Sequence, residues 1–248
     1  LPGGLRLDGV LDEPAWAAAP LIQRLTMTEP DEGGTPAAGT LVRVLADAHH
    51  LVIGIVALDP DPAGIVSTSK ARDPELRSED YVKVVLDPFL DGRTGYVFAI
   101  NPGAARYDAL VSRTSREGED SQWDAVWEAR TARSADGWSA EIRIPLKSLT
   151  FDAALDRWGF NVERRVERLQ EVSRWASPTR DAEVSQTSRA GLLTGLPEFD
   201  TGLGLTVRPA LVPSVAKAGE GGGWDGDAEP SLDVFQRLGS NLTAMATV

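Results

Sequence analysis

Alternating apolar and polar residues form short runs over much of the chain. In residues 138–144 every second residue is apolar, from Trp138 to Ile144, and Glu141 lies among the polar ones. A period of two residues places one set on each face of a half-buried β-strand. Residues 158–166 alternate in the same way, with Phe160 and Val162 opposite Glu163. Short strands that recur between turn signals, with no long helical pattern among them, predict an antiparallel β-sandwich with Trp138, Ile142, Phe160 and Val162 facing inward.

The two ends of the chain depart from this pattern. Residues 12–20 predict a short helix that Asp12 caps and Pro20 ends, with Trp16 as a core anchor. Residues 214–231 are rich in Gly, Ala and acidic residues, which is typical of a flexible loop. We therefore predict an all-β, jelly-roll-like sandwich over residues 1–202 and a C-terminal extension with this loop over residues 203–248.

The composition narrows the class of partner. The chain has 37 acidic and 25 basic residues, a net charge of −12, which repels a phosphate backbone, so we expect no nucleic-acid partner. The absence of cysteine excludes disulfides and thiolate metal sites. No apolar run approaches the roughly 20 residues of a membrane helix, so no membrane span is expected. Phosphate-loop, nucleophile-elbow and HExxH signatures are absent, which favours a protein that is not an enzyme.

An ordered series of short motifs gives the chain a family resemblance. The series comprises Leu7-Asp8-Gly9-Val10-Leu11-Asp12-Glu13-Pro14-Ala15-Trp16, Asp91-Gly92-Arg93-Thr94-Gly95-Tyr96, Trp123-Asp124 with Trp127, Gly137-Trp138 to Ile144-Pro145, and Trp158-Gly159-Phe160-Asn161. It resembles family 9 carbohydrate-binding-like domains over roughly residues 5–200. The resemblance implies a β-sandwich, sugar binding at one end, and a periplasmic or extracellular location. It also implies the N-terminal part of a bacterial envelope protein that continues into a β-barrel-like region, whose opening strands residues 203–213 and 233–248 resemble.

Aromatic rings are the first candidates for sugar binding, because their faces attract the polarised C–H groups of a sugar ring. The resemblance implies a clamp of two tryptophans around a terminal sugar. Trp175 fits one position, but residues 72–80, which fit the other, contain no aromatic residue. Trp123 and Trp127 are further candidates. The alternative for each of the three is packing beneath a loop or in the core, where Trp138 and Trp158 are also expected.

Charged residues supply the remaining candidates. Arg72 and Asp80 are expected to form an ion pair, either beside the sugar site or as a solvated or structural pair without a role in binding. Asp87 and Asp91 flank a turn and could offer oxygen ligands to calcium, or they could cap backbone N–H groups of the turn. Otherwise no cofactor is expected. Trp224 and Asp225, in the Gly-rich segment, are candidates for contact with a partner protein.

Two functions stay open at this point. The first is a non-catalytic carbohydrate-binding module outside the cytoplasm. The second is an interaction subunit on the periplasmic face of a larger membrane protein complex, which has kept the sandwich and lost sugar binding. A haem-binding relative is a third reading, for which only Met27 and Met245 with His49 and His50 offer axial ligands.

Overall fold

The computed structural model of the protein describes residues 4–111, 118–200, 205–217, 224–237 and 243–247. It divides into two compact units, Leu1–Asp200 and Thr201–Val248, and each is described by itself. The predicted boundary between residues 202 and 203 lies outside the described residues. No helix in the described ranges has the length and apolar character needed to cross a membrane.

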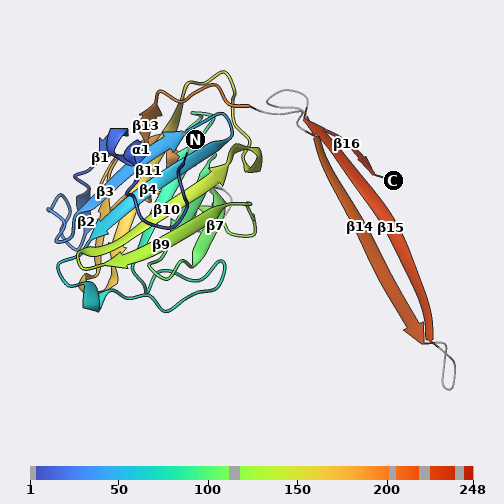
Figure 1. Ribbon diagram of the computed structural model, residues 1–248, viewed down its shortest axis with the longest axis horizontal. Coiled ribbons are helices and arrows are strands. Elements are labelled where there is room, and N and C mark those ends of the chain that lie inside the picture. The colour runs from blue at the N-terminus through green and yellow to red at the C-terminus, as the bar shows by residue number, and fades with distance from the viewer. Residues whose placement is uncertain (1–3, 112–117, 201–204, 218–223, 238–242, 248) are drawn as a thin grey trace. The chain divides into compact units, whose positions relative to one another are not determined.

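The first unit is an antiparallel β-sandwich, which confirms the predicted fold class (Figure 1). Its strands are β1 (Leu21–Ile22), β2 (Thr26–Glu29), β3 (Thr40–Ala46), β4 (His50–Leu58), β5 (Tyr81–Asp87), β6 (Tyr96–Ile100), β7 (Arg106–Val111), β8 (Glu119–Asp120), β9 (Glu128–Ser134), β10 (Gly137–Pro145), β11 (Arg157–Val166), β12 (Glu171–Arg174) and β13 (Gly191–Thr194). The helices are α1 (Pro14–Ala18) and the 3-10 turns η1 (Pro62–Gly64), η2 (Leu146–Ser148), η3 (Glu167–Leu169) and η4 (Thr187–Arg189).

Helix α1 begins one residue later than predicted. Glu13, rather than Asp12, is the N-cap residue, because Pro14 occupies the first helical position, where its missing N–H costs nothing. Ala19 forms the C-cap, and Pro20 follows the helix as expected.

Two sheets form the sandwich. The smaller has the strand order β1-β3-β4-β10-β9. The larger has the order β2-β12-β11-β5-β6-β7-β8, and β13 also pairs with β11. Strand β2 therefore lies at one edge of the larger sheet and β8 at the other.

The core lies between the two sheets. Trp138 and Ile142 from β10 belong to the same buried cluster as Phe160 and Val162 from β11, and each is at most 1% exposed. Trp158 is also fully buried in this cluster. The inward positions read from the alternation are thus confirmed.

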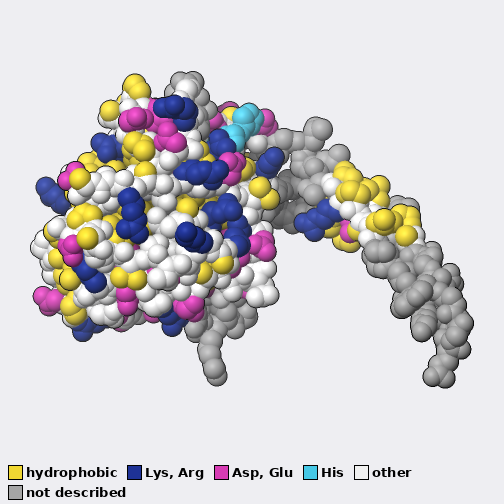
Figure 2. All heavy atoms as spheres, turned by 60° about the horizontal axis from the view of Figure 1, so that its bottom comes forward, with side chains coloured by type: hydrophobic (Ala, Val, Ile, Leu, Met, Phe, Trp, Pro, Cys, Tyr) yellow, Lys and Arg dark blue, Asp and Glu magenta, His cyan; other side chains and the backbone are white. Residues whose placement is uncertain are grey.

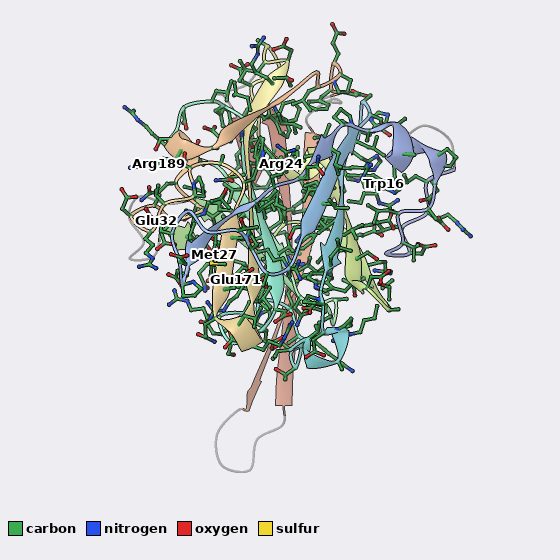
Figure 3. The ribbon with its side chains drawn as sticks, turned by 90° about the vertical axis from the view of Figure 1, so that its left-hand side faces the viewer. Trp16, Arg24, Met27, Glu32, Glu171 and Arg189 are labelled. Carbon is green, nitrogen blue, oxygen red and sulfur yellow. The ribbon has the colours of Figure 1, made fainter. Side chains whose placement is uncertain are left out.

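The N-terminal segment covers the outer face of the smaller sheet. Glu141 points outward from β10, yet it is fully buried, because it accepts hydrogen bonds from the backbone N–H groups of Asp8 and Gly9 and from Nε1 of Trp16. Its cross-strand neighbour is Gly54, where a Cβ atom would lie 2.8 Å from the Trp16 ring. Trp16 is buried as predicted, but on this outer face; Figure 3 places it on one side of the molecule and Met27, Glu32 and Arg189 on the other.

The second unit is an antiparallel three-stranded sheet of β14 (Leu205–Lys217), β15 (Trp224–Arg237) and β16 (Thr243–Thr247). The predicted loop over residues 214–231 is wrong for residues 214–217 and 224–231, because these pair with one another and extend the β14–β15 hairpin. The rest of that segment, residues 218–223, lies outside the described residues.

One face of this second sheet is apolar. Register places nine residues with described side chains on it, all of them apolar: Val207, Pro209, Leu211, Ala228, Pro230, Leu232, Val234, Ala244 and Ala246. Val207, Leu211 and Leu232 are 50%, 64% and 40% exposed. Figure 2 shows hydrophobic side chains gathered on the described part of this sheet, whereas acidic and basic side chains are interspersed on the face of the first unit that it draws.

Candidate functional site

A groove of about 1340 Å³ lies on the outer face of the larger sheet. Its floor is built from outward-facing residues of β12, β11, β5 and β7, and edge strands β2 and β8 contribute Thr28, Glu29 and Glu119. Residues 73–77 and 179–188 supply further lining from loops. The groove therefore combines a floor of paired strands with walls made of loops.

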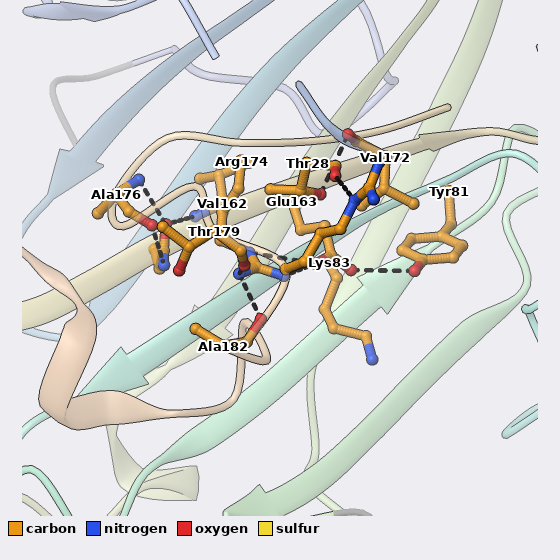
Figure 4. A network of polar contacts seen from close by, with 12 residues as sticks. Thr28, Tyr81, Lys83, Val162, Glu163, Val172, Arg174, Ala176, Thr179 and Ala182 are labelled. Carbon is orange, nitrogen blue, oxygen red and sulfur yellow. Dashed lines mark hydrogen bonds and ion pairs between the residues drawn. The ribbon is translucent and has the colours of Figure 1, made fainter. Parts of the chain in front are cut away.

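One end of the floor is a connected polar network (Figure 4). Glu163 on β11 accepts hydrogen bonds from the Tyr81 hydroxyl at 3.0 Å and from Nη2 of Arg174 at 2.7 Å. Arg174 also donates to the carbonyl oxygen of Ala182 at 2.7 Å. Burial, together with the neighbouring Glu163 carboxylate, raises the pKa of Tyr81 well above its ordinary value. The Tyr81 hydroxyl therefore stays protonated and remains a hydrogen-bond donor. Arg174 connects the floor to the wall formed by residues 179–188.

The middle of the floor is a lysine between two tyrosine rings. Nζ of Lys83 lies 5.8 Å from the ring centroid of Tyr81 and 5.7 Å from that of Tyr107, distances typical of cation–π contacts. Lys83 also pairs with Glu119 at 3.0 Å, and the Tyr107 hydroxyl donates to the same carboxylate at 2.9 Å. The side chain of Lys83 is 19% exposed and lines the groove.

Two small apolar clusters hold the walls against the sheet. Leu76, from the first wall, packs with Tyr81, Ala99 and Tyr107. Val184, from the second wall, packs on outward-facing residues of three neighbouring strands, namely Val85 of β5, Val97 of β6 and Ala109 of β7. Val97, Ala99 and Ala109 are therefore fully buried, and β6 contributes no residue to the lining of the groove.

The groove is polar and nearly neutral in charge. Six Lys or Arg and seven Asp or Glu residues line it, in contrast to the net charge of −12 of the whole chain. Most of the floor's charged groups already pair with one another, so the surface offers alternating donors and acceptors rather than a field of one sign. Such a surface suits an uncharged ligand with many hydroxyl groups better than a polyanion or a polycation.

The three predicted sugar-binding tryptophans lie elsewhere, and none of them lines the groove. Trp127 is 2% exposed and donates Nε1 to Asp108. Trp123 is half-buried, with its ring centroid 4.9 Å from that of Tyr96. Both pack in or against the core between the sheets. These contacts describe a structural role, and sugar binding by either residue stays a prediction.

Trp175 follows β12 and is half-buried against the same core. Its ring centroid lies 6.0 Å from that of Phe160. The ring also lies over Gly191 of β13, where a Cβ atom would come within 2.5 Å of it. A glycine at this position therefore leaves room for the indole. Stacking of Trp175 on a sugar stays a prediction, and its surroundings match the alternative of packing beneath a neighbouring segment.

The predicted ion pair between Arg72 and Asp80 is wrong. Asp80 is buried and accepts the backbone N–H of Glu167 at 2.8 Å, and burial raises the pKa of its carboxyl group. Arg72 instead lies among three carboxylates. It contacts the buried Asp108, and it pairs with Asp73 at 3.2 Å and with Asp124 at 3.1 Å.

These three carboxylates form the one group in the described part of the chain that is close enough to hold a metal ion, with ligand atoms within 4.8 Å of one another. The guanidinium group of Arg72 contacts all three of them. A cation bound there would have to displace this positive charge. The arrangement therefore reads as a salt-bridge cluster that holds the loop after residue 72 against β7.

The predicted calcium ligands both cap their own turn. Asp87 accepts the backbone N–H groups of Phe89 and Gly92, and Asp91 accepts those of Arg93 and Thr94. Burial alone raises the pKa of Asp91, but the hydrogen bonds from Thr94 and Arg93 outweigh it and lower the pKa below its ordinary value. Both carboxylates already have partners in this arrangement, and calcium binding there stays a prediction.

Trp224 and Asp225, the predicted partner contacts, begin β15 and pair in register with Lys217 and Ala216. Their side chains lie outside the described residues, so partner binding by them stays a prediction.

Sequence reasoning missed the groove, although one signal for it was present. Glu163 stood out as the polar side of an alternating strand, and Tyr81 and Lys83 occupy the same kind of position on β5. Polar outward positions on neighbouring strands are the pattern that identifies such a floor. Their pairing depends on the strand order, which the alternation does not supply.

No protein-family model and no curated protein sequence matches the chain. Solved structures do. A family 9 carbohydrate-binding module from Caldicellulosiruptor kristjanssonii, solved in complex with cellotriose, has a TM-score of 0.55 and 14% identity over 77% of this chain and 89% of the module. A module of this family from the same organism, solved with glucose, has a TM-score of 0.56 and 14% identity over 81% of this chain and 95% of the module.

A protein from Bacteroides uniformis, described as carbohydrate-binding, has a TM-score of 0.58 and 10% identity over 73% of this chain and 89% of its own. The chain therefore has the fold of family 9 carbohydrate-binding modules. At these identities the similarity establishes the fold, and the site must be argued from the residues of this chain.

Proposed function

We propose that the first unit is a non-catalytic carbohydrate-binding module that works in the periplasm or the extracellular space and binds its ligand in the groove. The observation that carries the proposal is the polar, nearly neutral floor of this groove, on a fold shared with modules solved in complex with sugars. Lys83 and Glu119, which are 19% and 11% exposed, offer a donor and acceptors to sugar hydroxyls. The more deeply buried pair of Glu163 and Arg174 holds the floor beside them in place. Tyr107, the more exposed of the two floor tyrosines, adds aromatic surface.

The proposed module needs no cofactor. Its recognition groups are side chains of the sheet itself, held in place by hydrogen bonds within the floor. Nothing in this arrangement requires a metal to orient the ligand.

A glycan array first identifies the ligand, and affinity electrophoresis in gels that contain the matching soluble polysaccharide, such as β-glucan or xylan, then tests the site. The gel should retard wild-type protein, and Lys83→Met should lose most of this retardation. Arg143→Met is the matched control, because Arg143 also forms an ion pair on the outer face of a central strand, with Glu128 at 2.8 Å, but outside the groove. A blank array, or equal loss in both variants, would contradict the proposal.

A second function is favoured by the apolar face of the second unit. An exposed apolar surface of this kind is typical of a protein interface. We propose that this sheet contacts a larger membrane-associated complex. Leu211→Asp should then abolish co-purification with that complex from the native envelope, whereas Ala210→Asp, on the opposite face of the same strand, should not. Equal behaviour of the two variants would contradict this second proposal.

A further inference from the structure

We infer that the groove binds an internal stretch of a glycan chain, several sugar units long, rather than a single terminal sugar; this inference rests on the proposed function. It states how many sugar units the ligand has and whether binding needs a free chain end. Three observations carry it: the course of the groove, its volume and the spacing of its polar groups.

The groove crosses the larger sheet from edge to edge. It is lined at one side by Thr28 and Glu29 of edge strand β2 and at the other by Glu119 of edge strand β8. All strands on the path from β2 to β8 except β6 contribute lining residues, and the six strand spacings between β2 and β8, of about 4.8 Å each, give a length of about 29 Å. The lining thus reaches both edge strands of the sheet, and at the β2 end it includes Arg180, which donates to the carbonyl oxygens of Thr28 and Pro30.

The volume of the groove also exceeds the need of one sugar. Its value of about 1340 Å³ lies above the range of about 300–1,000 Å³ that is usual for pockets that enclose a drug-sized ligand. A monosaccharide would leave most of the polar floor exposed to water. A chain that runs along the groove would instead contact the whole floor.

Polar groups recur along this course. Arg174 and Glu163 lie on β12 and β11, Lys83 lies on β5, and Tyr107 and Glu119 lie on β7 and β8. Successive sugar units would therefore each meet a donor and an acceptor. Trp123, Trp127 and Trp175, the predicted candidates for stacking on a sugar ring, do not line the groove.

The first experiment is calorimetric titration with glucose, cellotriose and cellohexaose, and with the corresponding xylo-oligosaccharides. We expect the affinity for the hexasaccharide to exceed that for the monosaccharide by about a hundredfold, because each added unit makes its own hydrogen bonds. Borohydride reduction, which opens the terminal ring, should leave the affinity of the hexasaccharide unchanged. Equal affinity for all lengths, or loss of binding on reduction, would overturn the inference but leave the proposed function intact.

The second experiment blocks the ends of the groove. Glu29→Trp and Ser121→Trp place a large side chain at exposed positions at the β2 and β8 edges. Each should weaken hexasaccharide binding by about tenfold and leave the trisaccharide unaffected. Ala153→Trp, at an exposed position outside the groove, is the control and should change neither. Undiminished hexasaccharide binding in both end variants would overturn the inference, and absence of binding at every length would overturn the proposed function with it.

Discussion

The two outer faces of the sandwich have the same alternating sequence pattern, but different segments of the chain cover them. Glu141 on β10 and Glu163 on β11 are both outward-facing glutamates of central strands, and both are buried. Glu141 is sealed beneath the N-terminal segment by backbone donors and Trp16. Glu163 lies in the floor of an open groove, where its partners are Tyr81 and Arg174.

The difference teaches that alternation identifies the outward face of a strand but not what covers it. Residues 8–16 cover the outer face of the smaller sheet through contacts with Glu141, which lies more than a hundred residues later in the sequence. On the other face, the loops over residues 73–77 and 179–188 cover part of the sheet through Leu76 and Val184 and leave a groove between them. The covered face should therefore contribute to stability, and the open face to binding.

The largest effect should come from Trp16→Ala. Removal of this buried ring should lower the free energy of unfolding by about 3–5 kcal/mol, because it leaves a cavity over Gly54. Urea unfolding measures this change. Sugar affinity of the protein that remains folded should not change, and a fall in affinity without a loss of stability would break the comparison.

Glu141→Gln should have a smaller effect, about 1–3 kcal/mol, because one or more buried donors lose their acceptor. Burial also raises the pKa of Glu141. The folded protein then binds this proton more tightly than the unfolded chain does, so wild-type stability should fall as pH rises from the ordinary glutamate pKa through the raised value. Thermal melts over this pH range should show that step in wild type and not in the variant.

Tyr107→Phe should have a still smaller effect on stability, about 0.5–1.5 kcal/mol, since it removes one hydrogen bond at a partly exposed position. It should nevertheless weaken sugar binding, because Glu119 loses one of the two side-chain donors that the described residues supply and keeps Lys83. Titration and melts of the same sample check both statements. Unchanged binding would show that the Tyr107 end of the floor takes no part in recognition.

Chelation should have the smallest effect, none within error. Asp87 and Asp91 already accept the N–H groups of their turn, so EDTA should leave both the melting temperature and the sugar affinity unchanged. Bound calcium would add stability by mass action, and a fall in melting temperature that added calcium reverses would establish it.

The sandwich could be predicted because several of its longer strands each carry their own signal. Trp138, Phe160 and their neighbours alternate with polar residues, and burial of the apolar set follows directly. The site could not be predicted in the same way, since its floor brings together single residues from several strands. The predicted sugar-binding tryptophans do not line the groove, since ring size favours burial wherever the fold offers space, as Gly191 does for Trp175.

Hydrogen exchange of the protein with and without bound oligosaccharide tests the central claim most directly. If the open face is the binding site, the ligand should slow exchange in residues 73–77 and 179–188, and it should leave residues 8–16 unchanged. Protection centred on Trp175 and Gly191, or on the N-terminal segment, with none in the groove walls, would contradict the account.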